Sequence, residues 1–397
     1  MLIGVVGKAN VGKSTFFKAA TLMDVEIANY PFATIKPNHG VGFVRVPCAD
    51  KHFGVQCHPR VGYCIDGIRF VPVDLIDVAG LVPGAHEGKG MGLEFLNDLN
   101  QADALIHVID ASGSTNEKGE PVPPGSRDPA EDIKFLAEEL DYWYLGILKK
   151  AWDKFARTVS QTNTEPYKAL HKQFSGLGST EDMIKQILVV MGLDERKLSA
   201  WSDDELFGFS RELRKRTQPM LIAANKIDVP GALENVERLR KEFPELIIVP
   251  CSGVAELVLK TAAKDGAIQY VPGGKGYDIS GALTAQQEKG LPVIQRTVLD
   301  VIGNTGVQEA LDGAVFSLLK YMPIFPGGVG KLADSEGRVM PDCWLLRQGS
   351  TALDFAYKIH TDLGRGFIRA IDVKTKRTVG KEHVLMPGDV VEIVSDR

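Results

Sequence analysis

The sequence predicts an α/β protein whose mostly parallel sheet carries a helical insertion, followed by a small C-terminal α+β module. Short apolar runs alternate with helical patterns, which is typical of βα units that cover both faces of a sheet. The runs are Leu2–Val6, Phe70–Ile76, Ala104–Asp110, Met220–Ala224 and Ile247–Cys251. We expect an α/β domain of residues 1–111 and 218–320, an insertion of residues 112–217, and a C-terminal module of residues 321–397.

Composition places the chain among ordinary globular proteins. Its 397 residues, 44% hydrophobic and 24% charged, can bury a sizeable core in about two or three domains. The formal net charge of −5 excludes a globally basic nucleic-acid binder but leaves room for a local basic face. No stretch of eighteen uncharged apolar residues occurs, and residues 1–7 run into a glycine-rich turn instead of a signal peptide. We therefore expect a cytoplasmic protein without membrane contact, of unspecified oligomeric state.

A Gly/Pro-rich stretch, GSTNEKGEPVPPGSRDP, opens the expected insertion and leads into a long amphipathic helix with a first-turn proline, Pro129. Its apolar positions recur at spacings of three and four: Ile133, Leu136, Leu140, Trp143, Ile147, Ala151 and Phe155. The expected cap pairs are Asp128 with Glu131, Ser179 with Asp182, and Ser202 with Glu205. Residues 112–217 are thus expected to be mainly helical.

The first apolar run ends in GKANVGKST, residues 7–15, which fits the pattern G-x-x-x-x-G-K-[ST] between a strand and a helix. Gly7 and Gly12 let backbone N–H groups approach phosphates, Lys13 reaches the β and γ oxygens, and the Ser14 hydroxyl can ligate Mg²⁺. The other expected contacts to the nucleotide come from Asn10, Val11 and Thr15. The motif predicts a phosphate-binding loop.

Three further loops follow strand ends, in the order that a guanine-nucleotide site requires. Asp77 can hold Mg²⁺ through water while the Gly80 N–H meets the γ-phosphate. In the second loop, Asn225-Lys226-Ile227-Asp228, the Asp228 carboxylate can accept hydrogen bonds from the N1–H and the exocyclic amine of guanine, which adenine does not offer. In the third loop, Cys251-Ser252-Gly253, backbone donors of Ser252 and Gly253 would meet guanine O6. Together the loops predict GTP and GDP as ligands.

The stretches NYPFATIKPN, residues 29–38, and DVAGLVPGAHEGKGMG, residues 77–92, resemble the two switch regions of the Obg-related GTPases of the translation-factor class. The insertion is similar to that of the Obg-like ATPase subfamily. The resemblance implies that Thr34 completes the Mg²⁺ shell. That subfamily lacks a proper guanine motif, whereas NKID is intact here, so we expect GTP. It also has a histidine, proposed as catalytic, after the strand that matches Ala104–Asp110, while residues 111–128 contain none.

Leu81 stands where many GTPases place the glutamine that orients the attacking water. Because an aliphatic side chain cannot hydrogen-bond water, the charge that develops on the phosphates needs another partner, such as an arginine from a second protein. The alternative is K⁺, which relatives of this family hold with a phosphate-loop asparagine, here Asn10. Asn10 can equally brace the loop by hydrogen bonding. The expected catalytic set is Lys13, Thr34, Gly80 and Asn10, with slow intrinsic hydrolysis.

The C-terminal segment GSTALDFAYKIHTDLGRGFIRA resembles the TGS family, a ubiquitin-like β-grasp fold associated with RNA or ribosome contact. Eight Lys/Arg face three Asp between Arg347 and Lys381, a surplus that can attract a phosphate backbone. We expect contact with the ribosome or structured RNA here, and a packed or solvated His360. The expected elements are a strand Trp344–Leu346, a helix capped by Thr351 with Asp354, and a strand Val390–Val394.

Three of the five cysteines lie close together in the sequence, in the segment between the first switch and the strand of Asp77. Thiolates and imidazoles at this density can bind Zn²⁺, although the spacing lacks the C-x₂-C pairs of common zinc knuckles. Free thiols or one disulfide are the alternative. The zinc hypothesis assigns the ligands to Cys48, His52, Cys57 and Cys64.

Three functions compete at this point. The first is a GTPase whose switch loops order with GTP and Mg²⁺ and relax on hydrolysis. The second is a nucleotide-gated RNA- or ribosome-binding scaffold with negligible turnover. The third is a P-loop kinase or transferase, which the NKID motif disfavours. Phosphate release separates the first from the second, and a phosphorylated acceptor would favour the third.

Overall fold

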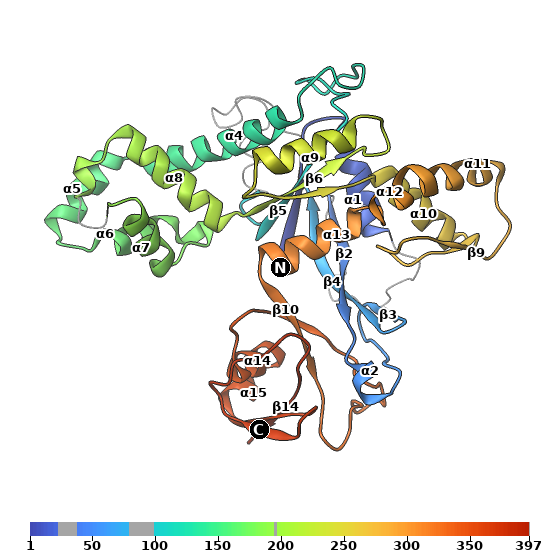
Figure 1. Cartoon of the computed structure of the whole chain (residues 1–397). Helices are drawn as coiled ribbons and strands as arrows, with labels where there is room; N and C mark the ends of the chain where they lie inside the picture. The colour runs from blue at the N-terminus through green and yellow to red at the C-terminus, as the bar shows by residue number, and fades with distance from the viewer. Residues whose placement is uncertain (23–37, 79–98, 194–196, 397) are drawn as a thin grey trace. The chain divides into compact units, whose positions relative to one another are not determined.

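The computed structural model describes residues 1–22, 38–78, 99–193 and 197–396 (Figure 1). The chain forms two compact units. One consists of Met1–Thr15 and Ile76–Ser252, and the other of Phe16–Leu75 and Gly253–Arg397. Residues 16–75 and 253–320 therefore group with the C-terminal module. This division differs from the expected division into three domains, which stays a prediction.

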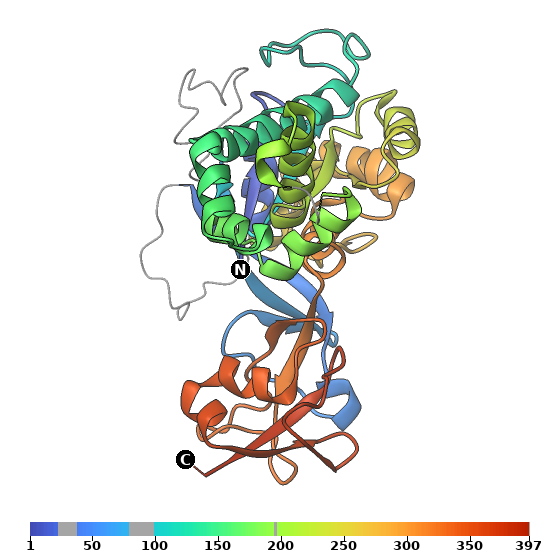
Figure 2. The same ribbon diagram turned by 90° about the vertical axis from the view of Figure 1, so that its left-hand side faces the viewer.

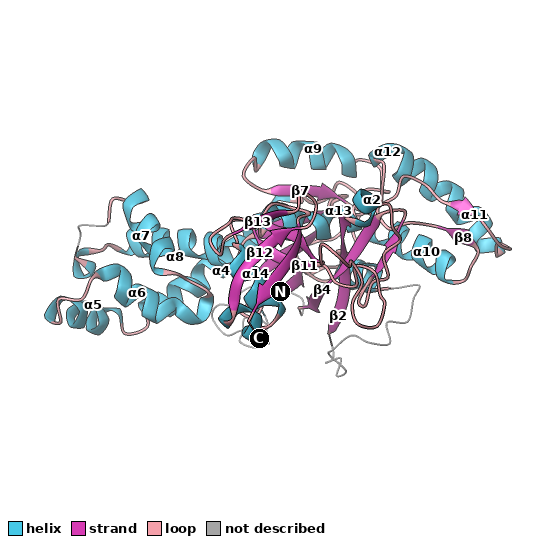
Figure 3. Ribbon diagram, turned by 90° about the horizontal axis from the view of Figure 1, so that it is seen from below, coloured by secondary structure: helices cyan, strands magenta, loops and turns pink. Residues whose placement is uncertain are grey.

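A seven-stranded sheet follows the hydrogen-bonded order β2-β4-β1-β5-β6-β7, with β3 paired to β4. Its strands are β1 (Leu2–Val6), β2 (His39–Pro47), β3 (Tyr63–Ile65), β4 (Ile68–Asp77), β5 (Ala104–Asp110), β6 (Met220–Asn225) and β7 (Ile247–Pro250). The neighbours β1-β5, β5-β6 and β6-β7 are parallel. Figure 3, coloured by secondary structure, labels β2, β4 and β7 of this sheet. Every residue of β5 and β6 is buried, as in strands covered on both faces. The predicted mostly parallel sheet is confirmed.

Helices connect these strands and continue beyond them. The helix α1 (Lys13–Thr21) follows the phosphate-loop motif, and α9 (Ala232–Glu242) packs on β7. Among the described residues, none of the helices has both the length and the apolar character needed to cross a bilayer. The other elements outside the insertion, up to residue 318, are α2 (Asp50–Phe53), α10 (Gly253–Lys264), β8 (Ile268–Gln269), β9 (Asp278–Ile279), α11 (Ala285–Ile294), a π-helical segment (Gln295–Leu299), α12 (Asp300–Ile302), α13 (Val307–Asp312) and a second π-helical segment (Gly313–Leu318).

The described residues of the expected insertion form five α-helices: α4 (Ala130–Lys149), α5 (Trp152–Gln161), α6 (Pro166–Phe174), α7 (Glu181–Val190) and α8 (Asp203–Thr217). Helices α4 and α8 pack against each other (Figures 1 and 2). The single long helix expected through Phe155 is wrong, because Ala151 adopts a left-handed φ of 59° and separates α4 from α5. This reversal leaves Trp152 packed on Trp201, with ring centroids 5.6 Å apart.

The three predicted helix starts in this region can be compared directly with the structure. Pro129, and not the expected Asp128, is the cap residue of α4, although the Asp128 carboxylate accepts a hydrogen bond from the Ala130 amide at 2.9 Å. Ser202 and Glu205 form the expected reciprocal capping box of α8. The cap of α7 is Thr180, which accepts a hydrogen bond from the Met183 amide, and not the expected Ser179. The Ser179 prediction was one residue too early. Ser179 and Thr180 both carry a hydroxyl group, and the acidic Asp182, three residues after Ser179, favoured the earlier position.

The C-terminal module has a five-stranded sheet in the order β11-β10-β14-β12-β13. Its elements are β10 (Tyr321–Pro326), β11 (Trp344–Arg347), α14 (Ala352–Ile359), α15 (Thr361–Arg365), β12 (Phe367–Asp372), β13 (Arg377–Val379) and β14 (Val390–Ser395). Thr351 and Asp354 form the predicted capping box of α14, and Phe355 of the same helix is fully buried. His360 lies exposed between the two helices and accepts a hydrogen bond from the Asp362 amide, as expected for a solvated histidine.

Candidate nucleotide site

The phosphate loop runs from β1 to α1, and its glycines are required by close contacts. At Gly7, a Cβ atom would lie 2.4 Å from the Val108 carbonyl oxygen. At Gly12, where φ is +92°, it would lie 2.3 Å from the Asn225 amide nitrogen. A side chain at either position would push the loop away from β5 or from the base-side loop. The loop can therefore follow this path only with glycine at both positions.

Lys13 and Asp77, both predicted to act on the phosphate and metal side, lie together. The Lys13 ammonium group donates directly to the Asp77 carboxylate, and Ser14 is exposed in the first turn of α1. A cation, a carboxylate and a hydroxyl are thus gathered at the carboxyl ends of parallel strands, where α/β proteins bind ligands. Thr34, Gly80 and Leu81 lie outside the described residues.

The predicted base-side loops are joined to the phosphate loop and to each other. Asn225 is buried and its side-chain amide donates to the Val11 carbonyl oxygen at 2.8 Å. The Ser252 hydroxyl donates to the exposed Asp228 carboxylate at 2.7 Å, while Gly253 begins α10 directly after it. The buried Asn225 and Ser252 therefore fix the positions of two of the loops, and Asp228 is held with one face open to solvent.

Lys226 is held by Asp110, a residue that the sequence reasoning did not single out. Its ammonium group donates to the Asp110 carboxylate at 2.9 Å, and its backbone is left-handed, with a φ of 65°. Burial tends to raise the pKa of Asp110, but hydrogen bonds from Ser112 and Lys226 outweigh burial and leave the pKa lowered. The signal in the sequence was an acid at the end of a buried strand, followed by the hydroxyl-rich ASGST.

Two side chains of the phosphate loop contact the segment that leads into the insertion. The buried Lys8 ammonium group donates to the Thr115 carbonyl oxygen at 3.1 Å and to the Asp132 carboxylate of α4 at 2.9 Å. Asn10 is left-handed, with a φ of 61°, and its amide donates to the Gly119 carbonyl oxygen at 2.8 Å. Asn10 therefore braces the loop, which was one of its two predicted roles. The other role, holding K⁺, involves its amide oxygen and is not decided by this bond.

The neighbourhood of Lys8 holds two unusual titrating groups. Burial raises the pKa of Asp132 even though the Lys8 charge opposes this. His107 on β5 is buried, and burial together with the Lys8 charge lowers its pKa to about 3, so this imidazole is neutral at pH 7. His107 lies within the strand and not in the loop after it, so it does not replace the histidine that the resemblance led us to look for.

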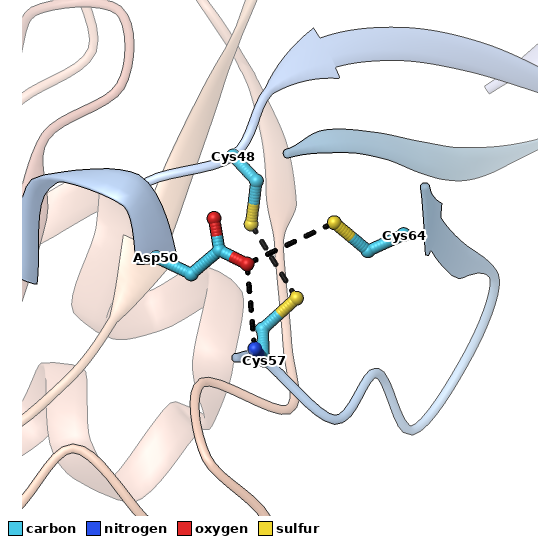
Figure 4. A group of neighbouring side chains, drawn as sticks. All are labelled: Cys48, Asp50, Cys57 and Cys64. Carbon is cyan, nitrogen blue, oxygen red and sulfur yellow. Dashed lines mark hydrogen bonds between the residues drawn. The ribbon is translucent and has the colours of Figure 1, made fainter. Parts of the chain in front are cut away.

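The cysteine-rich segment gathers three of its cysteines around an acid. Sulfur atoms of Cys48, Cys57 and Cys64 and a carboxylate oxygen of Asp50 all lie within 4.8 Å of one another (Figure 4). His52 is not in this group, so the donor set expected from the sequence is wrong in one member. Asp50 takes the place given to His52.

Comparisons with known proteins now identify the family. A family profile described as "50S ribosome-binding GTPase" matches residues 2–138. Profiles described as "Obg-like GTPase YGR210-like, G4 motif-containing domain" and "TGS domain" match residues 223–328 and 330–395. Together they account for the phosphate loop, the NKID loop and the C-terminal module.

Whole-chain relatives extend these matches. A GTP-binding protein of Methanocaldococcus jannaschii is 47% identical over 99% of each chain, and a rat Obg-like ATPase 1 is 26% identical over 93% of this chain and 81% of its own. A crystal structure of a GTP binding protein from Pyrococcus horikoshii OT3 matches with a TM-score of 0.79 and 39% identity over all of both chains. The chain therefore belongs to the Obg-like GTPase family and combines a GTPase domain of that family with a C-terminal TGS domain.

Proposed function

We propose that the protein binds GTP and hydrolyses it to GDP and phosphate as a Mg²⁺-dependent conformational switch. This proposal depends on the hydrogen bonds that hold the base-side loops to the phosphate loop and to each other. Asn225 fastens the NKID loop to Val11, and Ser252 orients Asp228 through a 2.7 Å hydrogen bond. An ionised Asp228 in this position selects guanine, because adenine lacks the two matching donors. The name of the M. jannaschii relative supports the choice, while the name of the rat relative makes ATP the competing nucleotide.

The residues around Lys13 fit a magnesium ion. Ser14 and Asp77 offer a hydroxyl and a carboxylate oxygen of the kind that Mg²⁺ prefers, and when bound the ion would offset phosphate charge. Thr34, which lies outside the described residues, would add a second hydroxyl oxygen. Lys13, which contacts Asp77 here, would turn its ammonium group to the β and γ oxygens, and Gly80 would donate its N–H to the γ-phosphate. In hydrolysis a water oxygen bonds to the γ-phosphorus, the bond to the bridging oxygen breaks, and the water proton leaves with phosphate.

With Leu81 in place of a glutamine, the developing negative charge needs a further positive group. Asn10 uses its amide nitrogen on Gly119, so its amide oxygen faces no competing demand from that bond and suits a K⁺ ion. A partner's arginine would serve the same purpose. We therefore propose slow intrinsic turnover that K⁺ or a partner increases.

The switch has two outputs in this proposal. Lys8 and Asn10 connect the phosphate loop to residues 115–132, so nucleotide state would be reported to the insertion. The TGS domain would contact the ribosome or structured RNA. Seven of the eight Lys/Arg between Arg347 and Lys381 are exposed, which supports attraction to a phosphate backbone. The "50S ribosome-binding" description of the matching profile supports the same partner.

Phosphate release by the full-length protein tests the proposal. We expect multiple turnovers with GTP and Mg²⁺, faster in K⁺ than in Na⁺ at equal ionic strength, and a loss of the difference in Asn10→Ala. Asp228→Asn should weaken GTP binding by roughly 10–100-fold, because the guanine donors lose an ionised acceptor. Asp265→Asn, an exposed acid at the end of α10, is the matched control.

Several outcomes contradict parts of this proposal. GTP binding without turnover, with ribosome binding that follows the nucleotide, would point to a gated scaffold. ATP bound as tightly as GTP would show that NKID does not select the base. A phosphorylated small acceptor would indicate a kinase, and equal co-sedimentation with ribosomes in GDP and in a non-hydrolysable GTP analogue would remove the ribosome-linked switch.

A further inference from the structure

The cysteine cluster lies in a short segment of one unit and is built from four different local structures. Cys48 follows β2, Asp50 begins α2, Cys57 lies in the loop after α2, and Cys64 is the middle residue of β3. Cys48, Asp50 and Cys57 are buried, at 5%, 2% and 3% exposure. The four side chains point toward a common centre (Figure 4). Residues distant along this segment are thus brought together away from water.

Two distances within the cluster are close to the edge of a metal-centred tetrahedron. Zinc–sulfur bonds of about 2.3 Å in tetrahedral geometry place neighbouring sulfur atoms roughly 3.8 Å apart. The Cys48 and Cys57 sulfur atoms are 3.6 Å apart, and the Cys64 sulfur lies 3.9 Å from Asp50 Oδ2. This spacing is too long for a disulfide, whose sulfur atoms are about 2.05 Å apart. The side chains therefore have the separation of ligands and not of a bonded pair.

Asp50 gives a second, independent indication of a ligand. Its Oδ2 atom accepts a hydrogen bond from the Cys57 amide at 3.3 Å, but its Oδ1 atom is buried and has no hydrogen-bond partner among the described residues. A buried carboxylate oxygen without a partner is costly, so native structures rarely leave one. A cation that the carboxylate binds through both of its oxygens would satisfy this atom.

Arg69 provides the charge that such a centre needs beside it. Its side chain is 1% exposed, and its guanidinium donates to the Met340 and Pro341 carbonyl oxygens at 2.6 and 3.3 Å. Within the described part of the chain it forms no ion pair with a carboxylate, and its Nε atom has no partner. Once its thiols lost their protons to a metal, the cluster would become an anionic group beside this buried cation.

We propose that Cys48, Asp50, Cys57 and Cys64 bind one Zn²⁺ ion in a closed, structural site. Three thiolates and a carboxylate around Zn²⁺ carry a net charge of about −2, which Arg69 partly offsets. A mixed sulfur and oxygen set of four favours zinc over an iron–sulfur cluster, which is usually held by four thiolates. The ion would enter as Zn²⁺ and displace the three thiol protons to solvent, without any redox step.

The position of the site gives it a role in attaching the TGS domain. The His58 and Arg60 amides donate to the Val339 and Pro341 carbonyl oxygens at 2.8 and 2.9 Å, within the same unit. Arg69 reaches the same stretch through Met340 and Pro341. A metal that fixes the loop between Cys57 and Cys64 would therefore fix the chain that leads into β11.

Metal content of the full-length protein, purified in the presence of a phosphine reductant, tests the site. We expect about one zinc per chain by elemental mass spectrometry. Cys48→Ser, Cys57→Ser, Cys64→Ser and Asp50→Ala should each bind zinc at least about 100-fold more weakly, since loss of a ligand exceeds the roughly 10–100-fold effect of losing an outer partner. His52→Ala and Cys251→Ser are the matched controls and should keep their zinc.

A measurement on the unaltered chain covers the case in which these variants do not fold. Protein stripped with a chelator and then given Co²⁺ should develop the visible bands and the sulfur-to-metal charge-transfer band of a tetrahedral thiolate site. The proposal is overturned if stripped, reduced protein takes up neither Zn²⁺ nor Co²⁺, if the ligand variants keep zinc as well as the controls do, or if His52→Ala loses it. The proposal is also overturned if the purified protein contains a Cys48–Cys57 disulfide and binds no metal once that disulfide has been reduced.

Discussion

Two buried cations, one in each compact unit, are accommodated in different ways. Lys8 in the phosphate loop, at 8% exposure, has a carboxylate 2.8 Å away on Asp132. Arg69 on β4, at 1% exposure, is bonded to main-chain carbonyl oxygens and lies beside thiols. The charge of Lys8 is therefore matched by an acid that is always present, whereas in the proposed zinc site that of Arg69 would be matched by thiols that become anionic when they bind the metal. The first arrangement is permanent, and the second depends on metal supply.

The largest expected effect comes from breaking the permanent pair. Lys8→Met removes the closest counter-charge of the buried Asp132 and leaves it only the 3.4 Å ion pair with Arg127, so it should lower the free energy of unfolding by up to about 3–5 kcal/mol. The double variant Lys8→Met/Asp132→Leu should recover most of this loss, because it removes both charges. Urea unfolding followed by tryptophan fluorescence suits the test, since Trp143, Trp152 and Trp201 belong to the same unit as this pair.

The stability that this pair contributes should depend on pH. Because burial already raises the pKa of Asp132, this group protonates readily once Lys8 is gone, so the loss in Lys8→Met should shrink as the pH falls. If the double variant is no more stable than the single one, Asp132 is not the group that balances the charge of Lys8. The contrast between Lys8 and Arg69 would then be wrong for Lys8.

The second effect concerns Arg69 and rests on the proposed zinc site. Arg69→Met should weaken zinc binding by roughly 10–100-fold, because the anionic centre loses its neighbouring cation, whereas Arg69→Lys should retain some of the affinity. Competition with a chromogenic chelator measures the change. The control is Arg60→Met, which removes a half-exposed arginine between Cys57 and Cys64 and should bind zinc normally. Equal affinity in Arg69→Met and the unaltered protein would separate Arg69 from the metal.

The smallest effect comes from Asp110, whose carboxylate holds Lys226. Asp110→Asn should cost about 1 kcal/mol at pH 7, since the charge-assisted bond becomes an ordinary one. The folded pKa of Asp110 is lowered, so its contribution is fully present above the unfolded value of about 3.9 and is lost as the pH falls through the folded pKa. Unfolding curves of the two proteins should therefore converge in acid. A constant difference down to about pH 2 would contradict this.

The regions of the fold that the sequence predicted are those with a strong local signal. Strand β5 was predicted with its observed bounds, and Thr351 with Asp354 marked the start of α14 correctly. Strands β2, β3, β10, β12 and β13 were among those not predicted. Of these, β3 and β13 have three residues each, and β12 mixes polar and apolar residues on a half-covered face. Such strands form through their neighbours in the sheet, and the signal for this lies elsewhere in the chain.

The candidate sites show the same limit. The nucleotide loops were found because each motif is contiguous, but Lys8, Asp110 and Asp132 act across more than a hundred positions of sequence. The zinc hypothesis took its ligands from the cysteines and histidines of the segment and did not consider Asp50. The two residues lie two positions apart on α2, where side chains point roughly 200° apart, so only one of them can face the cysteines.

The left-handed backbone at Asn10 and Lys226 has a consequence for how tightly a nucleotide binds. Asparagine tolerates this conformation, whereas for lysine it costs roughly 1–2 kcal/mol and persists because Asp110 fixes the side chain. Folding therefore sets the shape of both loops before any ligand arrives. An incoming nucleotide loses its own freedom but does not have to order these two residues, so more of the contact energy remains as affinity.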